Sequence, residues 1–156
     1  MRLPTLAVVF ALTAAPALAQ QSTPRQMMEQ LGVAPPAGQV ARAVERARGQ
    51  PLGTAANPVR VSGARAEHAY IGRLRCADGN MPRVGQRRND GVGAFGTIVD
   101  VWPLDCGDAA PGRFSLFMDM YHDDHEEQQA PTGFTLVPAE GGATTGKPAA
   151  PPDPAV

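Results

Sequence analysis

The sequence predicts a mainly β protein: a small antiparallel sheet or sandwich of about five strands with one disulfide, short N-terminal helices and a disordered C-terminal tail. Three observations predict this class. Short strand-like runs alternate with Gly, Pro, Asn and Asp between residues 52 and 138. The chain contains only two cysteines. Residues 139–156 hold almost no apolar side chain larger than Val, so burial there cannot offset the entropy cost of ordering.

Residues 1–19 have the features of a cleavable export signal. Met1 and Arg2 give a positive start, an apolar run follows, and Ala-Leu-Ala at 17–19 forms a small-x-small cleavage site after Pro16. The run is shorter than the about 20 apolar residues that a membrane-spanning helix needs, and no second run follows it. We therefore expect a periplasmic or secreted protein with no transmembrane segment in the mature chain. The formal net charge of −1 does not favour nucleic acid as a partner.

Residues 20–51 predict a weakly helical segment. Thr23, Pro24 and Gln26 have the arrangement of a capping box with Pro at the first helical position. A second helix is predicted over 39–48, where apolar residues recur at helical spacing. Isolated helices of this length are marginal in water, so we expect both to dock on the core or to fray.

Residues 52–138 predict a β domain that the disulfide cross-links. Its predicted strands lie at 59–61, 68–76, 96–104, 113–121 and 133–137. Alternation of apolar and polar residues gives the strands at 68–76 and 113–121 one buried face each. The strand at 96–104 is apolar on both faces, which predicts that it lies in the centre of the sheet.

One carboxylate, Asp100, interrupts this predicted central strand. A buried carboxylate without a partner is costly, so we expect Asp100 to find a cation or backbone donors. Arg73 or Arg75, on the predicted strand at 68–76, is the natural partner for a core ion pair. A catalytic acid or base is the alternative interpretation of Asp100.

The stretch from 78 to 95 combines Arg83, Arg87 and Arg88 with four glycines. It predicts a mobile loop or an irregular hairpin. Basic residues dominate this part of the chain and acidic residues the next, which favours pairing across the sheet. The alternative is that the three arginines form a loop that binds an anionic partner.

Cys76 and Cys106 end two of the predicted strands, and in an exported chain they predict one disulfide. Loop entropy gives such a bond a contribution of roughly 3.5 kcal/mol for a loop of about thirty residues. The bond would hold both ends of the arginine- and glycine-rich stretch. A redox pair or a pair of metal thiolates is the alternative, but the C-x-x-C spacing that favours it is absent.

Residues 121–127 hold the densest group of potential metal ligands. His122, His125 and Asp123 could bind Zn or Cu, because imidazole nitrogen suits these ions. Side chains three positions apart share a face on a helix but not on a strand. This segment leaves a strand, so a turn must bring the two rings together. The competing interpretation is a solvated loop that ends the strand.

Four motifs occur together in the β domain: Asn-Pro-Val-Arg at 57–60, Tyr-Ile-Gly-Arg-Leu-Arg-Cys at 70–76, Gly-Thr-Ile-Val-Asp at 96–100 and Met-Asp-Met-Tyr-His at 118–122. Together they resemble a group of small uncharacterised exported proteins of Gram-negative bacteria. The resemblance covers the β domain and neither end of the chain. It implies a periplasmic setting, and it implies no activity.

Three hypotheses of function follow. The first is a non-enzymatic binding or structural module of the cell envelope, with an envelope protein or a small ligand as partner. The second is a periplasmic metal-binding protein that uses His122 and His125. The third is a small enzyme with a site around Asp100, Asp119 and His122, although Asp119 and His122 fall on opposite faces of a regular strand. We assign no catalytic residue and no cofactor other than the Zn or Cu of the second hypothesis.

Overall fold

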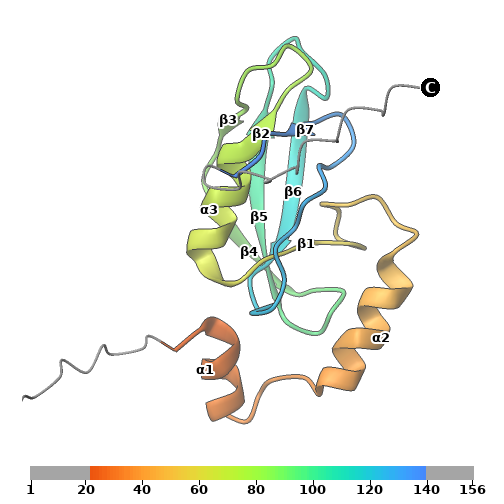
Figure 1. Cartoon of the computed structure of the whole chain (residues 1–156), viewed down its shortest axis with the longest axis vertical. Helices are drawn as coiled ribbons and strands as arrows, with labels where there is room; N and C mark the ends of the chain where they lie inside the picture. Colours follow the sequence, from red (N-terminus) through yellow and green to blue (C-terminus); the bar gives the residue numbers. More distant parts are fainter. Residues whose placement is uncertain (1–21, 140–156) are drawn as a thin grey trace, which may run out of the picture.

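The computed structural model describes residues 22–139 (Figure 1). The predicted signal peptide at 1–19 lies outside these residues, as does all of the predicted tail except Ala139. The described part contains seven strands and three helices, so the β-rich class is confirmed. None of the helices within 22–139 is long and apolar enough to cross a membrane.

The first two helices precede the sheet and lie at one end of it (Figure 1). Helix α1 spans Pro24–Gln30 and begins with the predicted capping box, in which the Thr23 side chain accepts from the Gln26 backbone N–H. Helix α2 spans Ala37–Ala47. Its buried residues pack on Phe95 and form a small cluster apart from the main core. Helix α2 is therefore docked on the rest of the chain, whereas α1 buries no residue.

The main sheet has five strands in the order β1-β6-β5-β3, with β4 also paired to β5. They are β1 Val59–Arg60, β3 Arg83–Val84, β4 Arg88–Val92, β5 Ile98–Asp105 and β6 Arg113–Asp119. Pairing is antiparallel except between β1 and β6, which are parallel because β1 leads into a helix and not into a hairpin. A separate pair joins β2 Leu74–Arg75 to β7 Thr135–Leu136. The expected all-antiparallel sheet is thus corrected to a mixed one.

The predicted strand at 68–76 is wrong, because most of this segment is helical. Helix α3 spans Gly63–Arg73, and only Leu74–Arg75 form the short strand β2. Buried residues recur at 67, 70, 71 and 74, which is helical spacing. Residues 70, 74 and 76 also fit the alternation of a strand. The charged residue at 67 interrupts the apolar positions of the helical stripe, so the helical spacing was not recognised.

The core lies between α3 and one face of the main sheet, so a helix covers this sheet in place of the second sheet of a sandwich (Figure 1). Its buried members are Val59, Val61, Tyr70, Ile71, Leu74, Cys76, Trp102, Leu104, Leu116, Met118 and Phe134. Strand β5 lies between β6 and the β3–β4 edge, as its two apolar faces predicted. Strand β5 is therefore paired with other strands along both of its edges.

The stretch predicted as a mobile loop or irregular hairpin forms the edge of this sheet. Strands β3 and β4 follow one another along β5. Val84 pairs with Leu104 and Arg88 pairs with Val101. The edge strand therefore advances four residues where β5 advances three, so the edge strand contains one extra residue, a β-bulge. A second register shift contains Gly91, whose φ of 82° is one that other residues rarely adopt. Residues 83–92 are thus a bulged edge strand.

Candidate functional site

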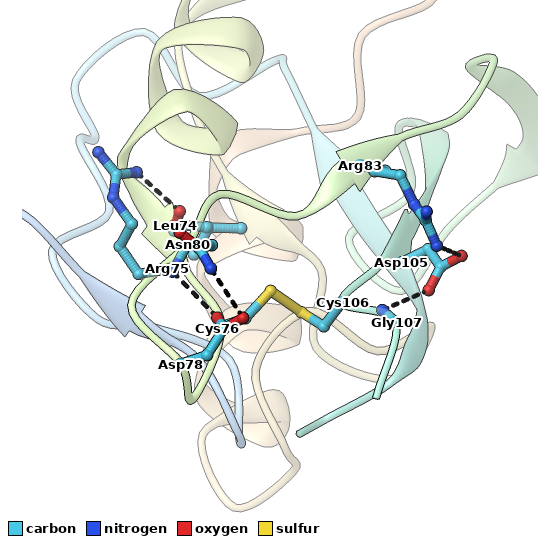
Figure 2. Close-up of a disulfide and its surroundings, with 9 residues drawn as sticks. All are labelled: Leu74, Arg75, Cys76, Asp78, Asn80, Arg83, Asp105, Cys106 and Gly107. Atoms are coloured by element: carbon cyan, nitrogen blue, oxygen red, sulfur yellow. Dashed lines mark hydrogen bonds and ion pairs between the residues drawn. A yellow bond between two sulfur atoms is a disulfide. The ribbon is translucent and has the colours of Figure 1, made fainter. Parts of the chain in front are cut away.

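The disulfide between Cys76 and Cys106 is confirmed, with Cα atoms 5.8 Å apart (Figure 2). Cys76 follows β2 and Cys106 follows β5, so the bond joins the end of α3 and β2 to the end of the central strand. Beside it, Asp105 accepts from the Gly107 backbone N–H at 2.8 Å and from Arg83 at 2.9 Å (Figure 2). These hydrogen bonds, the backbone one first, lower the pKa of the Asp105 carboxyl.

The three arginines of the predicted anion-binding loop do not act together. Arg83 is paired with Asp105, Arg87 points toward buried carboxylates, and Arg88 is exposed on β4. By the alternation of β4 along β5, Arg87 lies on the same face of the sheet as Asp100, whereas Arg88 lies on the other face. Two of the three guanidinium groups are thus already neutralised by the chain's own carboxylates.

Asp100 is held by an arginine, but by a different one from those expected. Its Oδ2 lies 3.2 Å from Nη1 of Arg87. Arg73 instead donates through Nε to the Val137 carbonyl at 2.8 Å, and Arg75 donates to carbonyls of its own segment. Because 68–73 is helical, Arg73 and Arg75 lie at the C-terminal end of α3 and not beside β5. The predicted pairing of Asp100 with Arg73 or Arg75 is therefore wrong, and Arg87 takes that place.

A second buried carboxylate, Glu67 of α3, joins this pair and was missed by the sequence reasoning. Its side chain is fully buried, and its Oε2 lies 3.6 Å from Arg87. The indole N–H of Trp102 donates to Oε2 at 3.4 Å, while Oε1 is buried without a hydrogen-bond partner among residues 22–139. Burial, followed by the charge of Asp100, raises the pKa of Glu67 to about 7. In the sequence, the one indication that Glu67 is buried is its helical spacing with residues 70, 71 and 74.

Trp102 completes this group, which we call the carboxylate cluster: Glu67, Asp100, Arg87 and Trp102. The Arg87 guanidinium lies 5.9 Å from the centre of the Trp102 ring. The His68 ring meets the Trp102 ring edge-on, with 4.9 Å between the two ring centres. Burial also raises the pKa of Asp100, although Arg87 opposes that shift. One half-exposed cation thus serves two buried acids, an arrangement that makes the cluster sensitive to pH.

Asp119 and His122 come together, contrary to the prediction from strand parity. Strand β6 ends at Asp119 and the chain then turns, so that His122 Nε2 lies 3.4 Å from Asp119 Oδ2, without the alignment of a hydrogen bond. Asp119 is itself held by the Thr97 hydroxyl and the Tyr121 N–H. Asp100 pairs with the residue before Asp119, and so it faces the other side of the sheet. The residues of the enzyme hypothesis therefore do not converge.

The proposed metal ligands each contact a different partner. His125 Nε2 lies 3.3 Å from Glu127, whereas His122 faces the carboxylate that ends β6. Asp123 accepts a hydrogen bond from the Thr23 hydroxyl at 2.6 Å. Among residues 22–139, no three His, Cys, Asp or Glu side chains gather to hold a metal ion.

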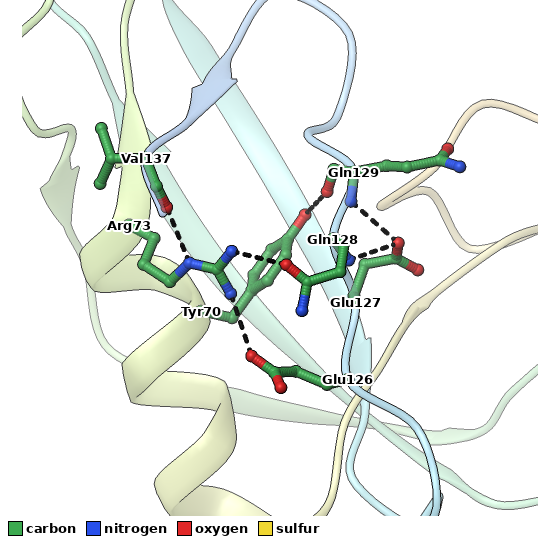
Figure 3. A network of polar contacts seen from close by, with 7 residues as sticks. All are labelled: Tyr70, Arg73, Glu126, Glu127, Gln128, Gln129 and Val137. Carbon is green, nitrogen blue, oxygen red and sulfur yellow. Dashed lines mark hydrogen bonds and ion pairs between the residues drawn. The ribbon is translucent and has the colours of Figure 1, made fainter. Parts of the chain in front are cut away.

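A cleft of about 400 Å³ lies between α3 and residues 123–127, and we call it the α3 cleft. Apolar side chains that line it include Val61, Ala66, Ala69 and Tyr70. Figure 3 shows how its walls are joined. The Tyr70 hydroxyl donates to the Gln129 carbonyl at 2.7 Å, and Arg73 contacts Glu126 at 3.4 Å and Gln128 at 3.0 Å.

A larger cleft of about 860 Å³ lies between α1, α2 and the turn at 121–125, and we call it the N-terminal cleft. Its lining combines apolar residues of α2 with charged side chains of both signs: Arg25, Arg48 and Arg60, and Glu29, Glu45, Asp123 and Asp124. His122 and Asp123 form part of the opposite wall. The 121–127 segment therefore separates two clefts.

No family model, curated protein or solved structure matches the chain. The resemblance to small exported proteins of Gram-negative bacteria therefore stays a prediction. The disulfide is compatible with a periplasmic or extracellular protein, because such bonds persist in oxidising compartments.

Proposed function

We propose that the protein is a small exported module of the cell envelope that acts by binding a ligand, and that the α3 cleft is its binding site. Export is supported by the predicted signal at 1–19 and by the disulfide. The observation that carries the binding function is the α3 cleft itself. Its volume of about 400 Å³ and its mainly apolar lining are those of small-molecule sites.

The walls of the α3 cleft are arranged before any ligand enters. Tyr70 and Arg73 of α3 each hold the opposite segment by side-chain hydrogen bonds, and Arg73 also holds Val137. Ligand binding then orders few side chains, which lowers its entropy cost. Arg73 forms an ion pair with Glu126. Asp124 also lines the cleft, is exposed, and forms no ion pair among residues 22–139. The cleft is therefore suited to an apolar ligand that is neutral or cationic.

The test uses N-phenyl-1-naphthylamine, a neutral apolar fluorophore, titrated into the full exported chain. The substitution Ala69→Phe fills the cleft, because Ala69 lines it and has space at the surface of α3. The matched control is Ala64→Phe, at an exposed position of the same helix outside the lining. We expect Ala69→Phe to weaken dye binding at least about tenfold and the control to leave it unchanged. Equal binding by both variants, or no binding by the wild type, would contradict the proposal.

A further inference from the structure

The N-terminal cleft has an apolar wall made by one stripe of α2. Ala37, Val40, Ala41 and Val44 line the cleft at positions i, i+3, i+4 and i+7 of the helix. Val40 is buried and Val44 half-buried, so this wall is continuous with the small core around Phe95. The stripe leads along α2 toward Arg48, which follows the last residue of the helix.

Arg60 of β1 lines the same cleft, and its guanidinium group is short of acceptors. The Arg60 side chain is half-buried, yet it makes no hydrogen bond or ion pair with any residue from 22 to 139. The other two arginines of the cleft are each held within their own segment. Arg25 pairs with Glu29 at 2.8 Å, and Arg48 pairs with Glu45 at 3.0 Å.

Burial is the main cause that lowers the pKa of Arg60. The charge of Glu127 opposes this shift, Arg48 adds to it, and Asp119 opposes it. Neither carboxylate comes within ion-pairing distance of Arg60: Glu127 is engaged by His125, and Asp119 by Thr97 and Tyr121. A partly buried cation without an ion pair among residues 22–139 is stabilised by an added anion.

The planar guanidinium group offers five N–H donors in a fork that matches a carboxylate. We propose that the N-terminal cleft binds a small organic carboxylate with an apolar body, in which Arg60 holds the carboxylate and the α2 stripe covers the body. The occupant is a free amphipathic carboxylate. This site lies on the other side of the 121–127 segment from the α3 cleft, and the two clefts share Asp123, Asp124 and His125 of that segment.

Sodium decanoate, below its micelle concentration, is the probe, and binding to the full exported chain is measured by calorimetry. Acetate and inorganic phosphate supply the anionic group without the apolar body. We expect decanoate to bind more tightly than either, and Arg60→Gln to weaken it at least about tenfold, because a charge-assisted hydrogen bond is lost. Arg83→Gln, which removes an exposed arginine outside this cleft, is the matched control and should bind as the wild type does.

Two further variants make the result decisive. Val44→Ser should weaken decanoate and leave acetate unchanged, since it alters only the apolar wall. Ala69→Phe, in the α3 cleft, should leave decanoate binding unchanged, so that the two sites are tested independently. Without ligand, Arg60→Gln should melt no lower than the wild type, because it removes an unpaired charge. Unchanged binding by Arg60→Gln, a lower melting temperature of that variant, or equal binding of phosphate and decanoate would each overturn the proposal.

Discussion

The carboxyl group of Glu67 makes the stability of the protein depend on pH, and Glu67→Gln isolates that dependence. The group is fully buried beside Asp100, and burial first, then this like charge, raises its pKa to about 7. In the unfolded chain its pKa returns to the ordinary value of 4.5. The glutamine keeps an acceptor for the Trp102 indole and offers N–H donors to the space around Asp100, but it does not titrate.

The sign and size of the effect follow from these two pKa values. Between pH 4.5 and about 7 the unfolded chain has released the proton that the folded protein still holds on Glu67. The contribution of Glu67 to the free energy of unfolding is therefore highest at acidic pH and falls as the pH rises through this window. The difference between the two pKa values corresponds to about 3 kcal/mol. Relative to the wild type, Glu67→Gln should gain stability of that order between pH 4.5 and about pH 8.

The assay is urea denaturation followed by far-UV circular dichroism at both pH values. Comparing the variant with the wild type cancels the titration of all other groups. Glu45→Gln is the control, because the Glu45 side chain is 65% exposed and its substitution should shift both curves equally. A stability difference between Glu67→Gln and the wild type that does not change with pH, or that changes in the opposite direction, would refute the reasoning.

Three other predictions follow. Arg87→Gln should cost about 2 kcal/mol at pH 8 and less at pH 5, because it leaves two buried carboxylates unpaired, whereas Arg88→Gln on the exposed strand should cost under about 0.5 kcal/mol in the same urea assay. Replacing Cys76 and Cys106 by serine should lower the free energy of unfolding by roughly 3 kcal/mol in urea, and an unchanged midpoint would contradict the assigned contribution of the disulfide. Added zinc should leave the melting temperature unchanged; a rise that His122→Ala abolishes would show that the turn can rearrange into a metal site.

The parts of the fold that were predicted correctly depend on local signals. The capping box at Thr23 is a pattern of adjacent residues, and the central position of β5 follows from its two apolar faces. The disulfide followed from the count of cysteines and from the predicted export. Such signals need no knowledge of which elements meet in space.

The failures involve contacts between distant elements. The segment containing α3 fits both a helix and a strand, and the buried charge of Glu67 hid its helical period. The partner of Asp100 could not be found from composition, since the register between β4 and β5 places Arg87 beside it. The carboxylate cluster combines α3, β5 and the segment between β3 and β4, so no single stretch of sequence contains it.

The edge formed by residues 83–92 has a consequence for how copies of the protein behave toward one another. Within residues 22–139 no strand pairs with the outer side of β3 and β4, so their backbone groups are open to a neighbouring chain. The two register shifts break the regular spacing that an added strand needs, and Arg88 and Asp90 place charges on the exposed rim. The irregularity of this edge thus opposes edge-to-edge aggregation in a concentrated solution of the protein.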